Sequence, residues 1–184
     1  MPLTQLDPTA ALIVIDLQKG LVSLDTVHPT SEIVARSAQL ARAFRERGLP
    51  VVLVNVTGGA PGRTNFVRAR HAFAADWAEL VPELEQQQED LLITKQRPGA
   101  FIGTNLDEIL RQRGVTQVFL TGIATGTGVE ATARSAYDHG YHVVFVVDAI
   151  TDRSAEAHSY CMENVFPKLG ELDTTEAVLK LFGD

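Results

Sequence analysis

The sequence contains very little cysteine and no long hydrophobic run. Cys161 is the only cysteine among 184 residues, so an internal disulfide and a cluster of metal-binding thiolates are both excluded. We expect Cys161 to be a small buried residue of the core. No apolar run approaches the roughly 18 residues that would cross a bilayer, and the first ten residues lack the basic and then apolar layout of a signal peptide. These features predict a cytoplasmic protein that does not contact a membrane.

Positive charge is also scarce. The chain has 16 Lys and Arg against 23 Asp and Glu, which gives a formal net charge of -7. Because a surface that binds nucleic acid is normally basic, the composition argues against a nucleic-acid partner. The hydrophobic content of 45% is that of a globular chain, and the length suits one folded unit. We therefore expect a single domain over residues 1–184.

Six short apolar runs alternate with segments that carry helix signals. The runs are residues 11–16, 50–56, 90–95, 117–122, 142–149 and, more weakly, 169–174. The predicted helices cover 29–47, 104–113, 128–139, the residues after Ser154 and the residues after Asp173. The expected amino-terminal caps are Ser154, Thr104 with Asp107, and Asp173 with Glu176. The expected stops at the carboxyl ends are Gly48, Gly114 and Gly140. This alternation predicts an α/β fold, a three-layer α/β/α sandwich around a six-stranded parallel sheet of Rossmann-like order 3-2-1-4-5-6.

Several polar side chains lie at or near the carboxyl ends of the predicted strands. In open parallel sheets, ligands bind beyond the carboxyl ends of the strands. Asp16, Asn55, Lys95, Asp148 and the turn after Gly122 should therefore converge on one edge of the sheet. Asp16 and Lys95 are the strongest candidates for chemistry, whereas Asp148 is better explained as a strand-end cap or as a partner of another site residue.

The region from Thr57 to about Asp90 has no clear periodicity. Loops of this length inside a compact domain are usually functional, so we predict a lid or a subunit interface. Phe66, Trp77 and Phe101 could line an apolar pocket, although core packing explains any one aromatic as well. His28 and His71 could reach the site from loops, but the five histidines show no spacing typical of metal ligands.

Residues 121–128, TGIATGTG, match the glycine spacing of short-chain dehydrogenases, and Asp148 lies where an acid could hold a ribose hydroxyl. The context argues against that function, because the motif follows the fourth predicted strand and not the first. The Tyr-xxx-Lys pair of those enzymes is also missing, since Tyr137 is followed four residues on by Tyr141. We therefore expect no nucleotide cofactor.

Three segments in order resemble the isochorismatase-like hydrolase family, which includes nicotinamidases and related amidohydrolases. The first is ALIVIDLQKG, which carries Asp16 and Gln18, and the second is ITKQRPGAFIGTNLDEILRQRG, which carries Lys95. The third is LTGIATGTGVEATARSAYDHGYHVVFVVDA. The resemblance covers almost the whole chain. It implies a small-molecule substrate, a homo-oligomer, and a cis peptide bond between Ile123 and Ala124.

The third segment departs from the family at Gly128, where most members carry the nucleophilic cysteine. Without a thiol, no covalent acyl-enzyme can form there. The isochorismate-cleaving members also have glycine at this position, and they hydrolyse an enol ether with an aspartate as general acid. By this resemblance Asp16 is the acid or base, Lys95 is its partner, and the backbone of residues 125–128 stabilises negative charge. The remaining predicted substrate contacts are Gln18, Ala124, Thr125, Thr127, Arg97 and Phe101.

The residues that hold a metal in the nicotinamidases have no counterpart here. Those enzymes use an Asp-x-His and further histidines after the second strand, where this chain has VNVTGGAPG. We therefore expect neither a metal nor a cofactor. Two other interpretations stay open: a silent relative that binds a small metabolite or serves as an oligomeric partner, and an amidase in which Asp16 activates water.

Overall fold

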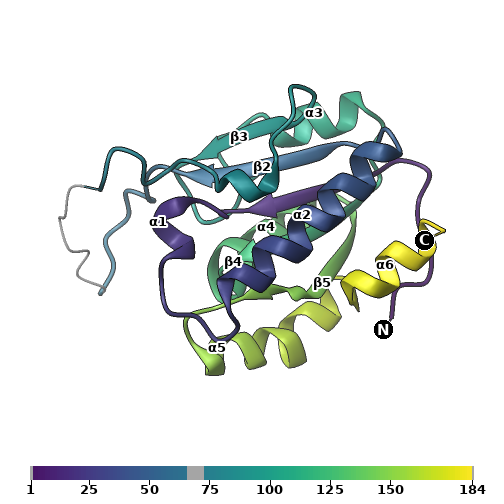
Figure 1. Ribbon diagram of the computed structural model, residues 1–184. Coiled ribbons are helices and arrows are strands. Elements are labelled where there is room, and N and C mark those ends of the chain that lie inside the picture. The colour runs from purple at the N-terminus through teal and green to yellow at the C-terminus, as the bar shows by residue number, and fades with distance from the viewer. Residues whose placement is uncertain (1, 66–72, 184) are drawn as a thin grey trace.

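The computed structural model describes residues 2–65 and 73–183. Its sheet contains six strands, which are β1 (Ala10–Ile15), β2 (Val51–Val56), β3 (Leu91–Lys95), β4 (Gln117–Ile123), β5 (His142–Thr151) and β6 (Glu171–Asp173). Every neighbouring pair is parallel, and the order across the sheet is β3-β2-β1-β4-β5-β6 (Figure 1). This arrangement confirms the predicted α/β fold and strand order.

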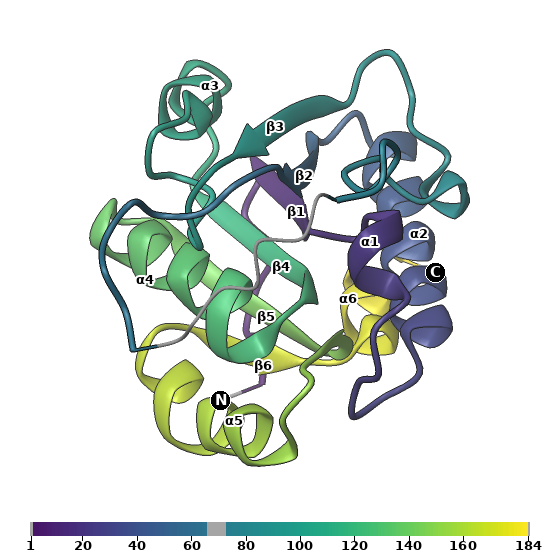
Figure 2. The same cartoon turned by 90° about the vertical axis from the view of Figure 1, so that its left-hand side faces the viewer.

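Helices cover both faces of the sheet. They are α1 (Lys19–Val22), α2 (Thr30–Glu46), α3 (Leu106–Gln112), α4 (Glu130–Asp138), α5 (Ala155–Tyr160) and α6 (Thr175–Leu181). Figure 2 shows α2 and α6 on one side and α3 and α4 on the other, which gives the three layers. Short 3-10 or π turns lie at Pro82–Leu84, Thr125–Val129, Cys161–Val165 and Phe166–Lys168.

Strand β1 shows why the sheet needs helices on both faces. All six residues of β1 are fully buried. Ala11, Ile13 and Ile15 belong to the core that contains α3 and α4 residues, while the alternate residues of β1 belong to the core under α2 and α6. Burying a Leu, Ile or Val side chain contributes about 1.5–3 kcal/mol, so a strand that is apolar on both faces is stable only between two layers of helices.

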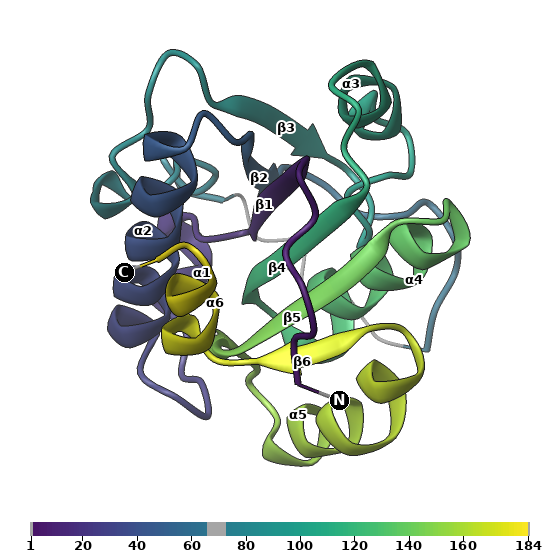
Figure 3. The same ribbon diagram turned by 90° about the vertical axis from the view of Figure 1, so that its right-hand side faces the viewer.

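The chain before β1 runs along the amino ends of the strands (Figure 3). The Leu3 N–H donates to the Asp173 carboxylate in β6 at 2.9 Å, and the Asp7 N–H donates to the Gln117 side chain at the start of β4 at 2.9 Å. These contacts tie the amino-terminal segment to β6 and to the start of β4.

Some helix ends differ from the predicted ones. The Ser154 hydroxyl accepts the Ala157 N–H at 3.1 Å, as predicted. The Thr104–Asp107 cap forms only in part: the Thr104 hydroxyl accepts the Leu106 N–H at 3.3 Å, but Asp107 binds Arg111 and Tyr141. The Asp173–Glu176 cap is wrong: Thr174 caps α6, and Glu176 pairs with Lys180. The three predicted stop glycines all have positive φ.

Strand β5 is longer than predicted, and this changes the place of Asp148. The register between β4 and β5 shifts, so that Gly122 lies opposite Ile150 and Ile123 opposite Thr151. Asp148 therefore lies within the strand. Its Oδ1 accepts the Thr175 N–H at 2.8 Å at the start of α6, and its Oδ2 lies 3.4 Å from Arg36. Asp148 is thus a helix cap, and the prediction that it joins the other strand-end side chains is wrong.

The region 57–90 is more regular in its described second half than the sequence indicated. Residues 77–81 run beside residues 17–20, with the Lys19 N–H donating to the Glu79 carbonyl at 2.8 Å and the Val81 N–H to the Leu17 carbonyl at 3.1 Å. Trp77 packs against Gly20. Phe66 and His71 lie outside the described residues. The described part thus forms a wall beside the carboxyl end of β1.

Candidate active site

A buried ion pair joins the ends of β1 and β3. Asp16 is the first residue after β1, and Lys95 is the last residue of β3. The Lys95 Nζ lies 2.6 Å from the Asp16 Oδ2, and the two side chains are only 2% and 6% exposed. Asp16 has a φ of 56°, a left-handed conformation that is uncommon outside glycine. Such strain persists only where the surrounding structure enforces it, and it is often found at functional sites.

Burial raises the pKa of Asp16 from its ordinary value of 3.8 to about 6, against the opposing effect of the Lys95 charge. At neutral pH, roughly nine in ten Asp16 side chains are then ionised. Oδ1, the second carboxylate oxygen, is buried and has no hydrogen-bond partner among the described residues. A buried acceptor without a hydrogen bond destabilises the folded chain unless a substrate or a water molecule donates to it.

The turn after β4 forms the third wall of the site. Gly122 has a φ of 114°, and a Cβ there would lie 2.0 Å from the Ile15 carbonyl oxygen, so only glycine allows β4 to approach β1 so closely. The Ile123–Ala124 peptide bond is cis. Thr125–Val129 then forms a π turn that leads into α4. A Cβ at Gly128 would lie 3.2 Å from the Asp16 Oδ2, so residue 128 faces the carboxylate.

Three backbone N–H groups of this turn are already used within the protein. The Gly126 N–H donates to the Asp152 Oδ2 at 2.7 Å, and the Thr127 and Val129 N–H groups both donate to the Ala124 carbonyl at 3.1 Å. The expectation that all of residues 125–128 point N–H groups at a substrate is therefore wrong. Thr125 and Gly128 are the two residues of this stretch whose N–H groups could serve an oxyanion.

A cavity of about 570 Å³ lies over the ion pair. Of the predicted site residues, five line it, namely Asp16, Lys95, Arg97, Thr127 and Gly128. Its other lining residues are Val56, Gly58, Gly59, Phe73 and Pro98. The Phe73 ring stacks on Trp77 with ring centroids 4.1 Å apart. The size suits a small metabolite.

The other predicted contacts lie outside the cavity lining. The Gln18 side chain is fully buried and joins the backbone of Val56 to that of Trp77, so it holds the wall in place. Phe101 is 6% exposed and packs in the core beside Tyr141. Thr125 is fully buried, and its hydroxyl shares a hydrogen bond with His158. These three predictions of direct substrate contact are not supported by the geometry, nor is the one for half-buried Ala124.

Asp152 and His158 support the turn from behind, and the sequence analysis missed both. Asp152 is 7% exposed and accepts the Gly126 N–H, as described above, and its other oxygen accepts the Ser154 N–H at 3.1 Å. The His158 Nδ1 lies 2.8 Å from the Thr125 hydroxyl, and its ring packs edge-on against His28. Burial and His28 lower the pKa of His158. The available signal was an acid two residues before the predicted cap Ser154.

Cys161 lies on the outer side of the same turn. It is 3% exposed, and its Sγ donates to the Glu130 carboxylate at 3.3 Å, which confirms its place in the core. Burial, together with Glu130, raises the pKa of the thiol to about 12. Within residues 2–65 and 73–183, no three His, Cys, Asp or Glu side chains are grouped as metal ligands would be, and no helix is long and apolar enough to cross a membrane.

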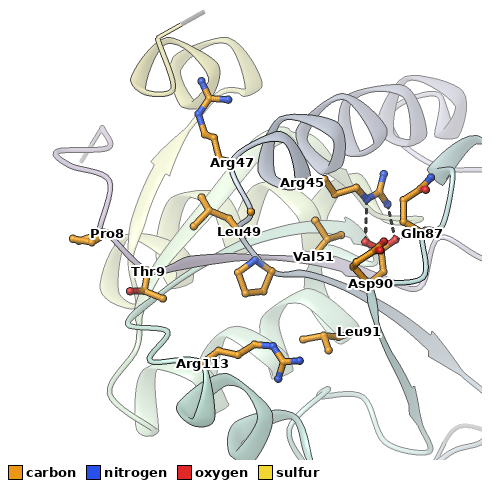
Figure 4. Close-up of a pocket in the computed structure, with 13 residues that line it drawn as sticks. Pro8, Thr9, Arg45, Arg47, Leu49, Val51, Gln87, Asp90, Leu91 and Arg113 are labelled. Carbon is orange, nitrogen blue, oxygen red and sulfur yellow. Dashed lines mark hydrogen bonds and ion pairs between the residues drawn. The ribbon is translucent and has the colours of Figure 1, made fainter.

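A larger cavity of about 700 Å³ opens at the opposite edge, near the amino ends of β2 and β3 (Figure 4). Arg45 lines it and makes two hydrogen bonds, of 2.9 and 2.7 Å, to the Asp90 carboxylate, whose side chain is 2% exposed. Arg113 lies on another side of the cavity. Because it contains neither the Asp16–Lys95 pair nor the turn after β4, this cavity is not the candidate active site.

Comparison with known proteins identifies the family of the chain. The family model for the isochorismatase domain matches residues 10–177. The isochorismatase family protein YwoC of Bacillus subtilis is 40% identical over 92% of both chains, and the ureidoacrylate amidohydrolase RutB of Stutzerimonas stutzeri is 30% identical over 98% of this chain and 86% of its own. The structure of an isochorismatase family protein from Burkholderia thailandensis superposes with a TM-score of 0.93, at 40% identity over 98% of both chains. The chain belongs to the isochorismatase family of hydrolases.

Proposed function

We propose that the chain hydrolyses a C–N or C–O bond of a small metabolite, with Asp16 as acid or base and Lys95 as its partner, and without a nucleophilic thiol. The observation that carries this proposal is the buried Asp16–Lys95 pair, 2.6 Å apart, in the wall of a cavity beside Gly128. Neither metal nor cofactor takes part in the proposed reaction.

The ionised form of Asp16 favours a base-catalysed reaction. A pKa of about 6 leaves the side chain mostly as carboxylate at pH 7, and a base in this range suits neutral conditions. The carboxylate takes a proton from water, the resulting hydroxide adds to an amide or ureide carbonyl, and the amine leaves with that proton. Lys95 and the Gly128 N–H are the proposed donors to the negative oxygen. RutB, a relative named as an amidohydrolase, is consistent with this reaction.

A second reaction uses the protonated form. Glycine at residue 128 matches the isochorismate-cleaving members, in which an aspartic acid protonates an enol ether. A pKa of about 6 keeps roughly one in ten Asp16 side chains protonated at pH 7. The acid transfers its proton to the vinyl carbon, and water adds to the resulting cation while returning one proton to the Asp16 carboxylate. The C–O bond of the hemiketal then breaks, and the proton of its hydroxyl group passes to the leaving oxygen.

The test compares the wild-type protein with Asp16→Asn against isochorismate and a panel of amides, ureides and esters. Exposed Asp25, mutated to Asn, is the matched control because it loses the same charge away from the site. Turnover and ligand binding are measured in parallel, and thermal unfolding shows whether each variant folds. We expect turnover in the wild type and the control and a loss of at least about a hundredfold in Asp16→Asn. Ligand binding without turnover in any of the three would show a silent binding protein.

The cellular and oligomeric predictions belong to the same proposal. We propose a cytoplasmic homo-oligomer on the strength of the family resemblance, and light scattering on the purified chain tests the assembly. Gly58, Gly59 and Phe73 bring the described parts of the region 57–90 to the cavity wall, which supports a role as a lid.

A further inference from the structure

Arg97 is a half-buried cation in the cavity wall. Its Nη1 donates to the backbone carbonyl of the neighbouring Gln96 at 2.9 Å. Across residues 2–65 and 73–183, no carboxylate is paired with it. The guanidinium therefore has donors to offer to a molecule in the cavity.

The described residues that line the cavity carry more positive than negative charge. Asp16 and Lys95 compensate each other in their ion pair, and Arg97 is the other charged residue among the described lining residues. An anionic group of a ligand would therefore meet a complementary charge at Arg97.

We propose that Arg97 determines specificity by binding a carboxylate of the substrate, an inference that rests on the proposed hydrolysis at Asp16 and Lys95. A guanidinium presents a planar pair of N–H donors that matches the two oxygens of a carboxylate.

The cavity also limits the size of the substrate. Arg97 and the Asp16–Lys95 pair line the same cavity of about 570 Å³, so one small molecule can contact all three side chains. Gly58 and Gly59 add no side chains to the lining, and the Phe73 ring offers an apolar surface. The inferred substrate is a short carboxylate that carries an amide, ureide or enol ether group.

The test uses matched probes that differ only at the anionic end. Succinamate is compared with succinamide, and N-carbamoylglycine with N-carbamoylglycinamide, in calorimetric binding and in turnover. The proteins are wild type, Arg97→Gln, Arg97→Lys and Arg113→Gln. Arg113 lies in the cavity at the opposite edge (Figure 4), so its variant loses the same charge without touching the site.

We expect wild type and Arg113→Gln to bind the carboxylates about ten- to a hundredfold more tightly than the amides. Arg97→Gln should remove this preference without weakening the binding of the amides, and Arg97→Lys should keep part of it. The inference would be overturned if the wild type bound both members of each pair equally or bound none of the probes. It would also be overturned if the preference for the carboxylates survived in Arg97→Gln. Preferential binding without turnover would instead refute the hydrolysis and leave the carboxylate site standing.

Discussion

The raised pKa of Asp16 makes the pH dependence of the reaction the sharpest test of the mechanism. For a pKa of about 6, the carboxylate fraction rises about tenfold between pH 5 and pH 7. If Asp16 is the base, kcat/KM should rise about tenfold over this range and then level off, because kcat/KM follows the ionisation of the free enzyme. If Asp16 is the acid, kcat/KM should fall about tenfold over the same range.

The folding stability gives an independent measure of the same pKa. Because the pKa of Asp16 is higher in the folded chain than its ordinary value of 3.8, the folded chain binds more protons between these two values. Stability therefore falls as pH rises from about 4 to about 6. Raising the pKa from 3.8 to about 6 corresponds to about 3 kcal/mol. In the Asp16→Asn variant, this pH-dependent contribution should be absent.

The assay is a pH series of initial rates at low substrate concentration, with urea unfolding of wild type and Asp16→Asn at the same pH values. Asp25→Asn is again the control, and its pH profile should match the wild type. A wild-type profile that is flat between pH 5 and pH 7 would contradict the reasoning, since an aspartate with an ordinary pKa is almost fully ionised throughout. A difference in the free energy of unfolding between wild type and Asp16→Asn that stays constant from pH 4 to pH 7 would contradict it as well.

Three further predictions concern separate parts of the chain. Gly128→Cys should cost about 1–3 kcal/mol of stability, because its Cβ would lie 3.1 Å from the Ile123 carbonyl oxygen. The new thiol should react with iodoacetamide while buried Cys161 does not, and mass spectrometry of the labelled peptides measures both reactions. Asp152→Asn should lower stability by about 1–3 kcal/mol and kcat by at least about tenfold, because the charged acceptor of the Gly126 N–H is lost; unfolding and rate measurements on one preparation check both. Asp90→Asn should lower the free energy of unfolding by about 3 kcal/mol, since Arg45 loses its buried partner, and leave kcat/KM unchanged at the opposite edge of the sheet.

The fold could be predicted because its signals are local. The six apolar residues of β1 are fully buried, and the same kind of run marks the other central strands. The helix between each pair of runs then requires parallel strands joined by crossovers. The weak points were residues whose partners are distant in sequence. Asp148 and Thr175 meet across 27 residues, and the longer β5 that brings them together depends on its register against β4.

The site was predicted in the same uneven way. Asp16 and Lys95 follow strands, so the geometry of a parallel sheet places them together, and the structure does so at 2.6 Å. Gln18 and Thr125 also lie in the matching segments, but their side chains turn away from the cavity toward Val56 and His158. The direction of a side chain beyond a strand end depends on the loop that surrounds it, which no periodic pattern specifies.

The proposed absence of a covalent intermediate depends on residue 128. A cysteine there would place its thiol beside the Asp16 carboxylate, since even a Cβ would lie 3.2 Å from the Oδ2. With glycine, the carboxylate faces space that a water molecule can fill, and the nearest thiol, Cys161, is buried behind the turn. In the proposed mechanism water attacks the substrate directly, so we expect no acyl-enzyme and the release of both products in one turnover step. A burst of the first product, or transfer of an acyl group from the enzyme to hydroxylamine, would show that another residue supplies a nucleophile.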